Sequence, residues 1–473
     1  MSNTLEDVTA TLRSTLPNRL VTPENGYEYE AEKSRPWSQL CWTTPAAFVR
    51  PEESTEVAET LKIVTNAKTK FALRTRGHTP NPGFNSTGND GIVIDLQNLR
   101  SMSLDTAQSV LHVGSGATWG EVYKFLEEHK LSTIGGRDGT VGLAGFLLGG
   151  GYPALPNLHG FGADGVKSFE IVLADSSVIT ADSSNNTELF HALKGGGSNF
   201  GIITSVGLNV YPLITVQYTL NMYAESDFAN IIGATVKAQE AMEHDHRPNL
   251  FTNFRNGVVV VGLLYGGSPG DEPKAFQPFS SLNSLINSLV PKTNGTILSL
   301  ANAMAHEIKP NKRTIGTVTT KVSYDLYIEV YKSWKQLVGE LPTGVEFHYT
   351  IQPVSASAVQ AGEDRGGNIM GLEKVSQCWW VFTAEWPEDD HDQVAQHAVS
   401  TMVKNVQERA RDMGLLLEYL CMNFADSKQD VLSSYGPANL RKLRDVAAQY
   451  DPEGIFQNLQ NDGFLLQKVE GHR

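Results

Sequence analysis

The sequence contains few cysteines, and they lie far apart. Only Cys41, Cys378 and Cys421 occur among 473 residues. This number and spacing argue against a disulfide-stapled scaffold and against a cysteine-based metal cluster. The run Glu243-His244-Asp245-His246 carries side chains that ligate metals, but consecutive placement before Arg247-Pro248 is typical of a solvated turn. We therefore expect no metal.

Long apolar runs are also absent. No stretch approaches the roughly 20 apolar residues that a helix needs to span a bilayer. Residues 1–20 are polar and of mixed charge, unlike a secretory signal peptide. Sequons at Asn85, Asn185 and Asn294 carry little weight without a secretory signal. These features favour a cytoplasmic protein without a membrane partner.

Positive charge is scarce, and the common nucleotide-binding motifs are missing. The net charge of -14 disfavours non-specific attraction to nucleic acid or to anionic membranes. No G-x-G-x-x-G lies between a strand and a helix with an acidic residue about 20 positions later, and no Walker A pattern occurs. Any bound nucleotide must therefore be held by another scaffold.

The chain is long enough for two domains, and its composition is that of a globular protein. Short strand patterns alternate with short helices up to about residue 210. Ser54 opens an expected helix, and Thr118 with Glu121 predicts a capping box at another. The expected strands of this region are 71–73, 92–94, 110–113, 170–173, 178–180 and 202–210.

The middle of the chain has a different pattern. Asn256-Gly257 between two apolar runs is the strongest hairpin signal in the sequence. Residues 345–351, 378–386 and 415–422 predict further strands, and an apolar stripe over 399–406 predicts an amphipathic helix. We expect an α+β fold of two domains, the second an antiparallel β-sheet covered by helices on one face. The expected division is 1–40 as an N-terminal segment, 41–210 and 211–425 as domains, and 426–473 as a segment returning to the first domain.

Glycines gather in four segments of the first domain. Glycine lets the main chain approach a ligand closely and lets successive N–H groups converge on an anion. The alternative is that they serve tight turns between short strands, which for any single segment is about as plausible as ligand binding but is harder to maintain for four. The four segments are Arg74-Thr75-Arg76-Gly77-His78, Gly114-Ser115-Gly116, Gly139-Thr140-Val141-Gly142 continuing to Gly149-Gly150-Gly151, and Gly195-Gly196-Gly197-Ser198-Asn199-Phe200-Gly201.

Together these motifs resemble the vanillyl-alcohol-oxidase, or PCMH-type, FAD-binding domain, and within it the fungal berberine-bridge-enzyme-like oxidases. The first segment resembles the family's R-S-G-G-H loop, and the last, with Ile202-Ile203-Thr204, its G-G-G-x-N-F-G-I-V-T signature. Gly114 to Trp119 resembles G-x-G-A-x-W, and Tyr450 to Phe456 resembles the closing Y-D-P-x-x-x-F. The resemblance covers nearly the whole chain.

This resemblance implies FAD as the cofactor and a covalent bond from His78 to the flavin 8-methyl group. Many relatives add a second bond from a cysteine in G-x-C-P-T-V-G, whereas residues 136–142 here lack cysteine. We therefore expect a single covalent link and a less open pocket. The residues expected to hold the cofactor are His78, Arg74, Thr75, Arg76, Gly77, Thr79, Gly139, Thr140, Val141, Gly142, Gly145, Gly150, Gly201, Ile203 and Asn423.

Oxidation of a substrate by a flavin needs a base that takes a proton from the substrate while hydride moves to the flavin. The family's Y-x-N-Y segment resembles Tyr419 to Phe424 with one extra residue and a phenylalanine in place of the second tyrosine. Tyr419 is the first candidate base, with strand core as the alternative. Glu385 is a second candidate, for which a solvent-facing strand end is the alternative. His348 and Tyr349 must point to opposite faces of their strand.

The resulting hypothesis is an FAD-linked oxidase that acts on a small alcohol or phenol-like natural-product intermediate and passes electrons to dioxygen, with hydrogen peroxide as the product. A flavin-dependent oxidative cyclase or cycloaddition catalyst of secondary metabolism is an alternative. A dehydrogenase with another electron acceptor and a flavin-holding storage protein are the others. Neither the substrate nor the oligomeric state is determined by the sequence.

Overall fold

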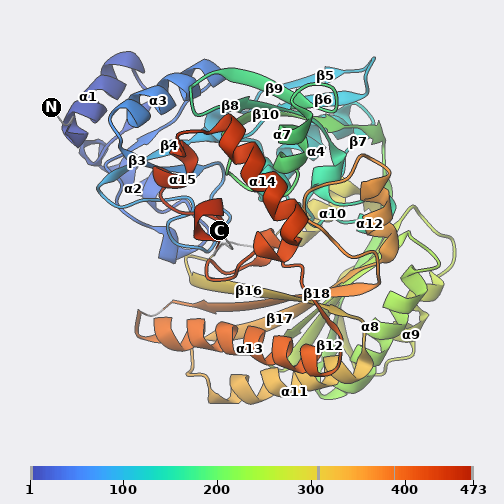
Figure 1. Ribbon diagram of the computed structural model, residues 1–473. Helices are drawn as coiled ribbons and strands as arrows, with labels where there is room; N and C mark the ends of the chain where they lie inside the picture. Colours follow the sequence, from blue (N-terminus) through green and yellow to red (C-terminus); the bar gives the residue numbers. More distant parts are fainter. Residues whose placement is uncertain (1–3, 306–308, 388, 470–473) are drawn as a thin grey trace.

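The computed structural model describes residues 4–305, 309–387 and 389–469. Two lobes lie one above the other (Figure 1), the upper built from the N-terminal half and the last helices, the lower from the middle of the chain. Parallel and antiparallel sheets combine with helices, so the predicted α+β fold is confirmed.

The first sheet of the upper lobe has the order β1-β2-β4-β3. Its inner strands are parallel, and β1 joins β2 in antiparallel fashion. Val57, Leu61 and Val64 share the buried face of α3, as their helical spacing predicts, and pack on this sheet with α1. The elements are α1 (Leu5–Thr15), β1 (Leu20–Val21), α2 (Tyr27–Lys33), β2 (Ala47–Val49), α3 (Ser54–Asn66), β3 (Lys70–Arg74) and β4 (Gly91–Asp95).

The second sheet of the upper lobe is antiparallel, with the order β5-β6-β10-β8-β9. The predicted capping box is present at α4, where Thr118 accepts from the Glu121 N–H and Glu121 accepts from the Thr118 N–H. The strands are β5 (Met102–Asp105), β6 (Val110–Gly114), β8 (Val166–Val172), β9 (Val178–Asp182) and β10 (Ile202–Asn209). Around them lie α4 (Trp119–Glu128), β7 (Leu131–Ser132), α5 (Leu143–Leu148), α6 (Pro156–His159), α7 (Thr187–Leu193), β11 (Tyr211–Pro212), α14 (Pro437–Tyr450) and α15 (Ile455–Asn458).

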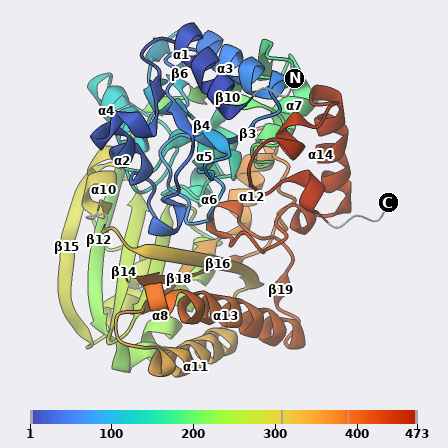
Figure 2. The ribbon, with the colours of Figure 1, turned by 90° about the vertical axis from the view of Figure 1, so that its left-hand side faces the viewer.

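The lower lobe is one eight-stranded antiparallel sheet with helices below it (Figures 1 and 2). The Asn256-Gly257 turn joins two of its strands, and the φ of +90° at Gly257 explains the glycine. In sheet order the strands are β15 (Leu285–Thr296), β12 (Thr215–Ala224), β14 (Val258–Gly266), β13 (Pro248–Arg255), β17 (Glu346–Val354), β18 (Gln377–Trp386), β16 (Lys312–Lys321) and β19 (Leu416–Leu417). The helices below it are α8 (Phe228–Met242), α9 (Gln277–Ser280), α11 (Tyr324–Glu340) and α13 (Asp392–Asp412), whereas α10 (Ile297–Met304) and α12 (Ala356–Glu363) lie on its upper side against α4 and α6.

The two faces of this sheet have different surroundings. Tyr349, Ile351 and Trp380 belong to a core formed with α8, α11 and α13. Trp379, one residue from Trp380, belongs instead to a core that includes side chains of the upper lobe. Because strand side chains alternate, His348 faces the upper lobe while Tyr349 faces the helices, as predicted. One face of the sheet is thus the floor of the junction between the lobes.

The strand predicted for 415–422 is wrong beyond its first residues. Only Leu416–Leu417 pairs, at the edge of the sheet with β16, and Met422–Phe424 forms a 3₁₀ turn. The chain leaves the sheet because its next polar groups find partners elsewhere: the Leu420 N–H donates to Ser434 Oγ, and the Asn423 side chain bonds to the upper lobe. This departure brings Asn423 to the junction.

Candidate flavin site

The loop after β3 lies against the glycine segment after β7. A Cβ built on Gly142 would lie 2.9 Å from Arg76 Cγ and 3.2 Å from Thr75 Oγ1, so only glycine allows this approach. Gly142 in turn forms a bridge with Thr118, and the Gly120 N–H donates to the Gly139 carbonyl at 2.9 Å. Three segments far apart in the sequence, 74–79, 114–120 and 139–142, are therefore brought together. Thr140 and Val141 lie within the last of them.

The remaining glycine segments converge on the same region. The Gly197 N–H donates to the Leu148 carbonyl at 3.0 Å, which joins the fourth segment to the end of the third. Gly150 has a φ of +96°, and a side chain there would strike Met370 Sδ at 2.3 Å. Gly201 packs against Ile171, which is also the strand partner of buried Ile203. The four predicted segments form one continuous set of loops.

Asn423, in the turn that follows the edge strand β19 of the lower sheet, is hydrogen-bonded to these loops. Its Oδ1 accepts from the Gly151 N–H at 2.9 Å, and its Nδ2 donates to the Gly145 carbonyl at 3.2 Å. A Cβ on Gly149 would lie 2.3 Å from Asn423 Nδ2. The loop that contains Thr79 is tied to the same stretch, because Asn81 Nδ2 donates to the Ala425 carbonyl at 3.0 Å. Asn423 thus lies among the residues expected to hold the cofactor.

His78 lies at the edge of this set of loops and is only partly buried. Its imidazole is stacked on the Trp37 indole, with ring centroids 4.9 Å apart and an interplanar angle of 12°. The backbone N–H of Trp37 donates to the Gly77 carbonyl at 3.0 Å, which holds Trp37 beside the loop. The imidazole is therefore held by a neighbouring ring.

The arginines of the loop have different surroundings. Arg74 is fully buried, and its guanidinium donates to Asp95 Oδ2 at 2.7 Å and to Glu32 Oε2 at 2.9 Å. These contacts direct its side chain into the lobe, so only its main chain lies beside the glycine loops. Arg76 pairs with Glu121 at 3.2 Å and is partly exposed, and burial lowers the pKa of its guanidinium. Of the two, Arg76 is the cation that faces the loops.

Buried polar atoms without a hydrogen-bond partner in the described part of the chain surround these loops. They include both side-chain polar atoms of Asn85, which lies beside Gly77, together with Ser86 Oγ, Ser115 Oγ and Arg76 Nε. Such groups are rare in proteins because leaving them unpaired is costly. Closely packed glycine loops and unpaired polar atoms suit a large polar ligand such as FAD.

The opposite wall of the junction carries a charged cluster on the lower sheet. Glu385 Oε2 accepts from Arg313 Nε at 2.8 Å, and Glu385 Oε1 lies 3.6 Å from His348 Nε2. Burial alone would raise the pKa of the Glu385 carboxyl, but the adjacent His348 imidazole and the Arg313 charge outweigh it and lower that pKa to about 2. The solvent-facing placement considered for Glu385 is therefore wrong: only 18% of its side chain is exposed.

His348 is held neutral within this cluster. Burial lowers the pKa of its imidazole, although the neighbouring Glu385 carboxylate acts in the opposite direction. Its Nδ1 lies 3.1 Å from Asn253 Nδ2, so Nδ1 is the acceptor and Nε2 carries the proton that faces Glu385. The carboxylate is thus fixed between a neutral imidazole and a guanidinium.

Tyr419 has quite different surroundings. Its ring packs between Trp379 and Tyr435, its hydroxyl donates to Met370 Sδ at 3.4 Å, and only 4% of the residue is exposed. Burial raises the pKa of its phenol well above the ordinary value. A buried phenol of raised pKa stays protonated and is a poor proton acceptor, so Tyr419 is a core residue as in the alternative, although it lies beyond the end of β19 and not in a strand.

Several residues of the junction were missed from the sequence. Trp37 falls in the N-terminal segment that we placed outside the first domain, and Arg313 falls in β16, which we did not predict. Arg313 nevertheless connects the two walls, because it donates to Glu385 and to the Trp37 carbonyl and lies 4.7 Å from the Trp37 ring centroid. No local pattern marks either residue, although the many β-branched residues over 314–320 are typical of a strand.

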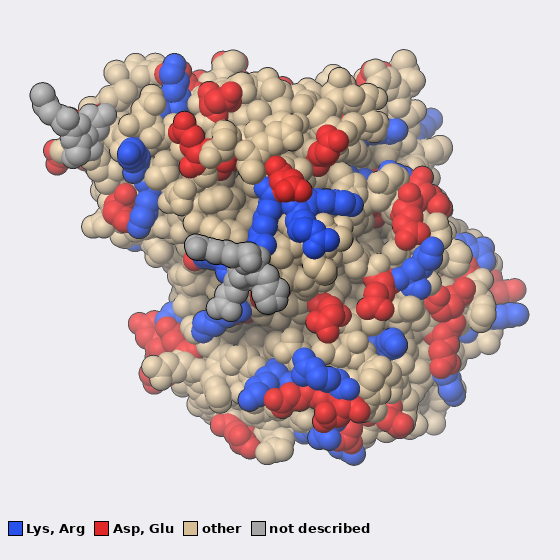
Figure 3. Space-filling view, viewed as in Figure 1, with Lys and Arg blue, Asp and Glu red and all other residues tan. Residues whose placement is uncertain are grey.

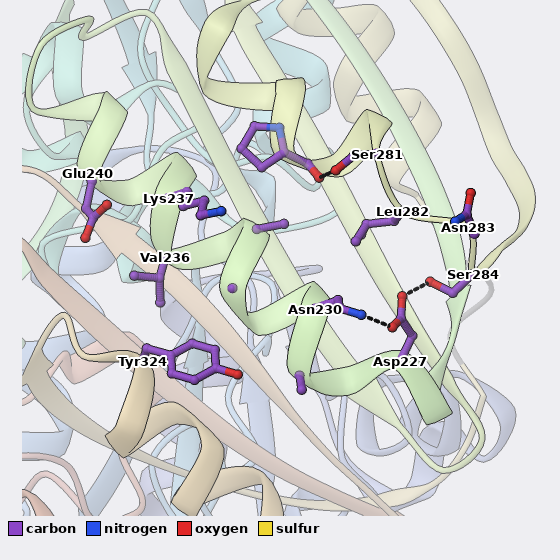
Figure 4. Close-up of a pocket in the computed structure, with 14 residues that line it drawn as sticks. Asp227, Asn230, Val236, Lys237, Glu240, Ser281, Leu282, Asn283, Ser284 and Tyr324 are labelled. Atoms are coloured by element: carbon purple, nitrogen blue, oxygen red, sulfur yellow. Dashed lines mark hydrogen bonds between the residues drawn. The ribbon is translucent and has the colours of Figure 1, made fainter.

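A separate hollow lies on the helix-covered side of the lower sheet, between α8 and 278–284, with a volume of about 870 Å³ (Figure 4). Its polar groups pair with one another: Asp227 accepts from Asn230 at 2.6 Å and from Ser284 at 2.5 Å. It has no contact with the glycine loops. Figure 3 shows acidic and basic side chains mixed over the front face of both lobes.

No helix in the described ranges is long and apolar enough to cross a membrane.

Comparison with known proteins supports a flavin site. Residues 45–182 match the model of a family described as FAD binding domain. An FAD-dependent monooxygenase of Arthrobotrys oligospora is 35% identical over 444 residues, covering 93% of this chain and 86% of that protein. The bifunctional solanapyrone synthase of Alternaria solani is 28% identical over 463 residues, covering 97% and 88%.

Solved structures share the whole fold. Physcomitrella patens BBE-like 1 superposes with a TM-score of 0.80 at 17% identity, covering 99% of this chain and 100% of that one. Glucooligosaccharide oxidase from Acremonium strictum, whose structure concerns a 6-S-cysteinyl, 8α-N1-histidyl FAD, superposes with a TM-score of 0.80 at 18% identity, covering 96% and 99%. Both likenesses extend over the upper and lower lobes.

Proposed function

This chain belongs to the PCMH-type family of FAD-dependent oxidoreductases, which has berberine-bridge-enzyme-like members, and we propose that it is an oxidase with FAD bound covalently through His78. The proposed substrate is a small organic molecule, an alcohol or phenol-like natural-product intermediate, with dioxygen as the electron acceptor. The observation that carries the proposal is the junction itself, where the glycine loops with His78 face an ionised Glu385.

Within this proposal, bound FAD supplies a two-electron acceptor for the hydride that leaves a substrate C–H. The loops 74–79, 139–142 and 149–151, with Asn423, hold it, and His78 anchors it. The glucooligosaccharide oxidase named above carries an 8α-histidyl link, which supports the same role for His78. At the position of that family's second tether this chain has Asp138, whose Oδ1 accepts from the Thr140 N–H at 2.8 Å, so we propose one link alone.

We assign the base to Glu385 rather than to Tyr419. The carboxylate is ionised at neutral pH and is fixed by two neighbours, whereas the Tyr419 hydroxyl is buried against Met370. A low pKa does not prevent this role, because an alcohol that loses hydride becomes a protonated carbonyl, a stronger acid than any carboxylic acid. Glu385 therefore accepts the hydroxyl proton as the C–H bond breaks.

The cofactor assignment is tested by acid precipitation of the purified protein. Yellow colour should stay in the pellet of the natural protein and be absent from the pellet of His78→Ala. Colour released to the supernatant by the natural protein would refute the covalent link while leaving FAD binding intact. A protein that is colourless and takes up no added FAD would refute the whole proposal.

The electron acceptor separates the candidate reactions. An oxidase yields one hydrogen peroxide per product. A monooxygenase is the second candidate, since the relative from Arthrobotrys oligospora bears that name, and it would place one atom of ¹⁸O₂ in the product. An oxidative cyclase is a further candidate. It would form a new ring, whereas a dehydrogenase would show slow reoxidation of reduced enzyme by dioxygen.

A further inference from the structure

Arg137 stands between the two lobes at the junction. It lies between β7 and the Gly139–Gly142 segment, and its guanidinium carbon is 4.9 Å from the ring centroid of Tyr152 and 5.2 Å from that of Phe251. Tyr152 directly follows the Gly149–Gly151 loop, while Phe251 belongs to β13 of the lower sheet. The guanidinium is thus held by one aromatic ring from each wall.

The hydrogen bonds of this guanidinium are incomplete. Nη2 donates to Gln352 Oε1, whereas Nη1 is buried and has no hydrogen-bond partner among the residues that the structure describes. Burial lowers the pKa of Arg137, yet an arginine stays protonated at neutral pH. A buried donor on a full positive charge is therefore left unpaired.

The absence of a counter-charge distinguishes Arg137 from the other arginines of the junction. Arg74 pairs with Asp95 and Glu32, and Arg313 pairs with Glu385. Within the described ranges no carboxylate pairs with Arg137. Tyr152 does not supply the charge, because burial raises the pKa of its phenol to about 12 and its hydroxyl donates to the Pro353 carbonyl at 2.6 Å.

The position of Arg137 suits a substrate contact. Gln352 lies on the same face of β17 as His348, four residues along, which is about 13 Å at the rise of an extended strand. Arg137 and the Glu385 cluster therefore lie at opposite ends of one stretch of the sheet floor. A molecule oxidised beside Glu385 and extending along this floor would reach Arg137 near the rings of Tyr152 and Phe251.

We propose that Arg137 binds an anionic oxygen of the substrate, so that the substrate is a flat organic acid with a carboxylate or an ionised phenol at the end remote from the oxidised carbon. This inference rests on the proposed function, because it assigns a substrate class to the same junction. The carboxylate or phenolate would accept from Nη1 and supply the missing counter-charge, while the two rings would pack on the flat body.

The test is calorimetric titration of the flavin-loaded protein with benzoate and with benzamide, which has the same shape and no charge. We expect the natural protein to bind benzoate at least about tenfold more tightly than benzamide, since a charged hydrogen bond is lost with the amide. Arg137→Gln should abolish this preference and leave benzamide binding unchanged, and Arg137→Lys should keep part of it. Arg247→Gln removes an exposed arginine that directly precedes β13 and pairs with Asp245, and it should change nothing.

Titration with 4-nitrophenol above and below its own pKa distinguishes the two kinds of acid. Tighter binding of the phenolate than of the phenol, lost in Arg137→Gln, would assign the contact to an ionised phenol; a preference for benzoate alone would assign it to a carboxylate. Equal affinity for benzoate and benzamide in the natural protein, together with no phenolate preference, would overturn the proposal without any variant.

Two further outcomes would also overturn it. Unchanged benzoate affinity in Arg137→Gln, with a shifted flavin midpoint potential, would mean that the guanidinium serves the cofactor instead. Equal loss of benzoate and benzamide binding would mean that it only shapes the pocket. Flavin content measured on each sample keeps a failure of the proposed function separate, since a protein without flavin fails that proposal whatever it binds.

Discussion

The Trp37 indole lies parallel to the His78 imidazole, 4.9 Å away between ring centroids, although Trp37 precedes the first strand of the parallel core. The contact places an aromatic side chain from the N-terminal segment beside the residue proposed to anchor the flavin. Because Trp37 also contacts Arg313, it is one of the points at which the two walls of the junction meet.

Removal of this ring should slow covalent attachment of the flavin. Stacked aromatic pairs contribute about 0.5–1.5 kcal/mol, so Trp37→Ala should attach FAD roughly two- to tenfold more slowly than the natural protein. Trp37→Phe keeps a ring and should be close to normal. Colour in acid-precipitated pellets, followed over time after FAD is added to apoprotein, measures the rate, and equal rates for all three proteins would show that the stack does not orient His78.

The choice of base predicts opposite results at two positions. Glu385→Gln keeps the shape but loses the proton acceptor, so flavin reduction should slow by about 10²- to 10⁴-fold. Tyr419→Phe removes only a weak hydrogen bond to sulfur and should slow it by less than about tenfold. Anaerobic stopped-flow absorbance measures both. A large loss in Tyr419→Phe with near-normal Glu385→Gln would return the role to the tyrosine.

The pH dependence should reveal the influence of Arg313. In the natural protein the Glu385 pKa is about 2, below its ordinary 4.5. The carboxylate therefore stays ionised, and protonation of this base does not lower kcat/KM until strongly acid pH. Arg313→Gln should raise that pKa by about 1–3 units, and its activity should fall as pH drops through the new value. The kcat/KM profile measures this shift. An unchanged acid limb would show that Glu385 is not the titrating base.

The same pKa has a consequence for stability. A carboxylate whose pKa is lowered by folding stabilises the folded state above its unfolded pKa, and this contribution is lost as pH falls from about 4.5 toward 2. Arg313→Gln should therefore reduce the free energy of unfolding more at pH 7 than at pH 3. Urea unfolding at the two pH values is the matched measurement.

The buried ion network around Arg74 should be structural. Asp95 and Arg74 are both fully buried, and Asp95 also accepts from Arg35, so Asp95→Asn leaves buried cations poorly paired and should cost about 3–5 kcal/mol. Asp90→Asn breaks an exposed pair with Lys70 and should cost less than about 1 kcal/mol. Urea unfolding of the flavin-loaded proteins compares them, and equal losses would contradict a special role for the network.

Much of the local structure could be predicted because it depends on near neighbours. The Thr118–Glu121 capping box, the Asn256-Gly257 hairpin and the α3 stripe each involve residues within a few positions of one another, and all are confirmed. The end of the strand after Leu417 could not be predicted, because it depends on Ser434 and on distant glycine loops that accept the departing chain.

The sequence by itself determined which loops can approach a dinucleotide, since a glycine or a histidine acts through its own backbone freedom or its own ring. Only the tertiary structure decided which charges meet: Arg74 turns inward to Asp95, Arg313 pairs with Glu385, and Arg137 is left without a carboxylate in the described structure. Arg313 and the Trp37 carbonyl are 276 positions apart. The pKa of a group depends on the charges and the burial around it, and those are set by the packing of the two lobes.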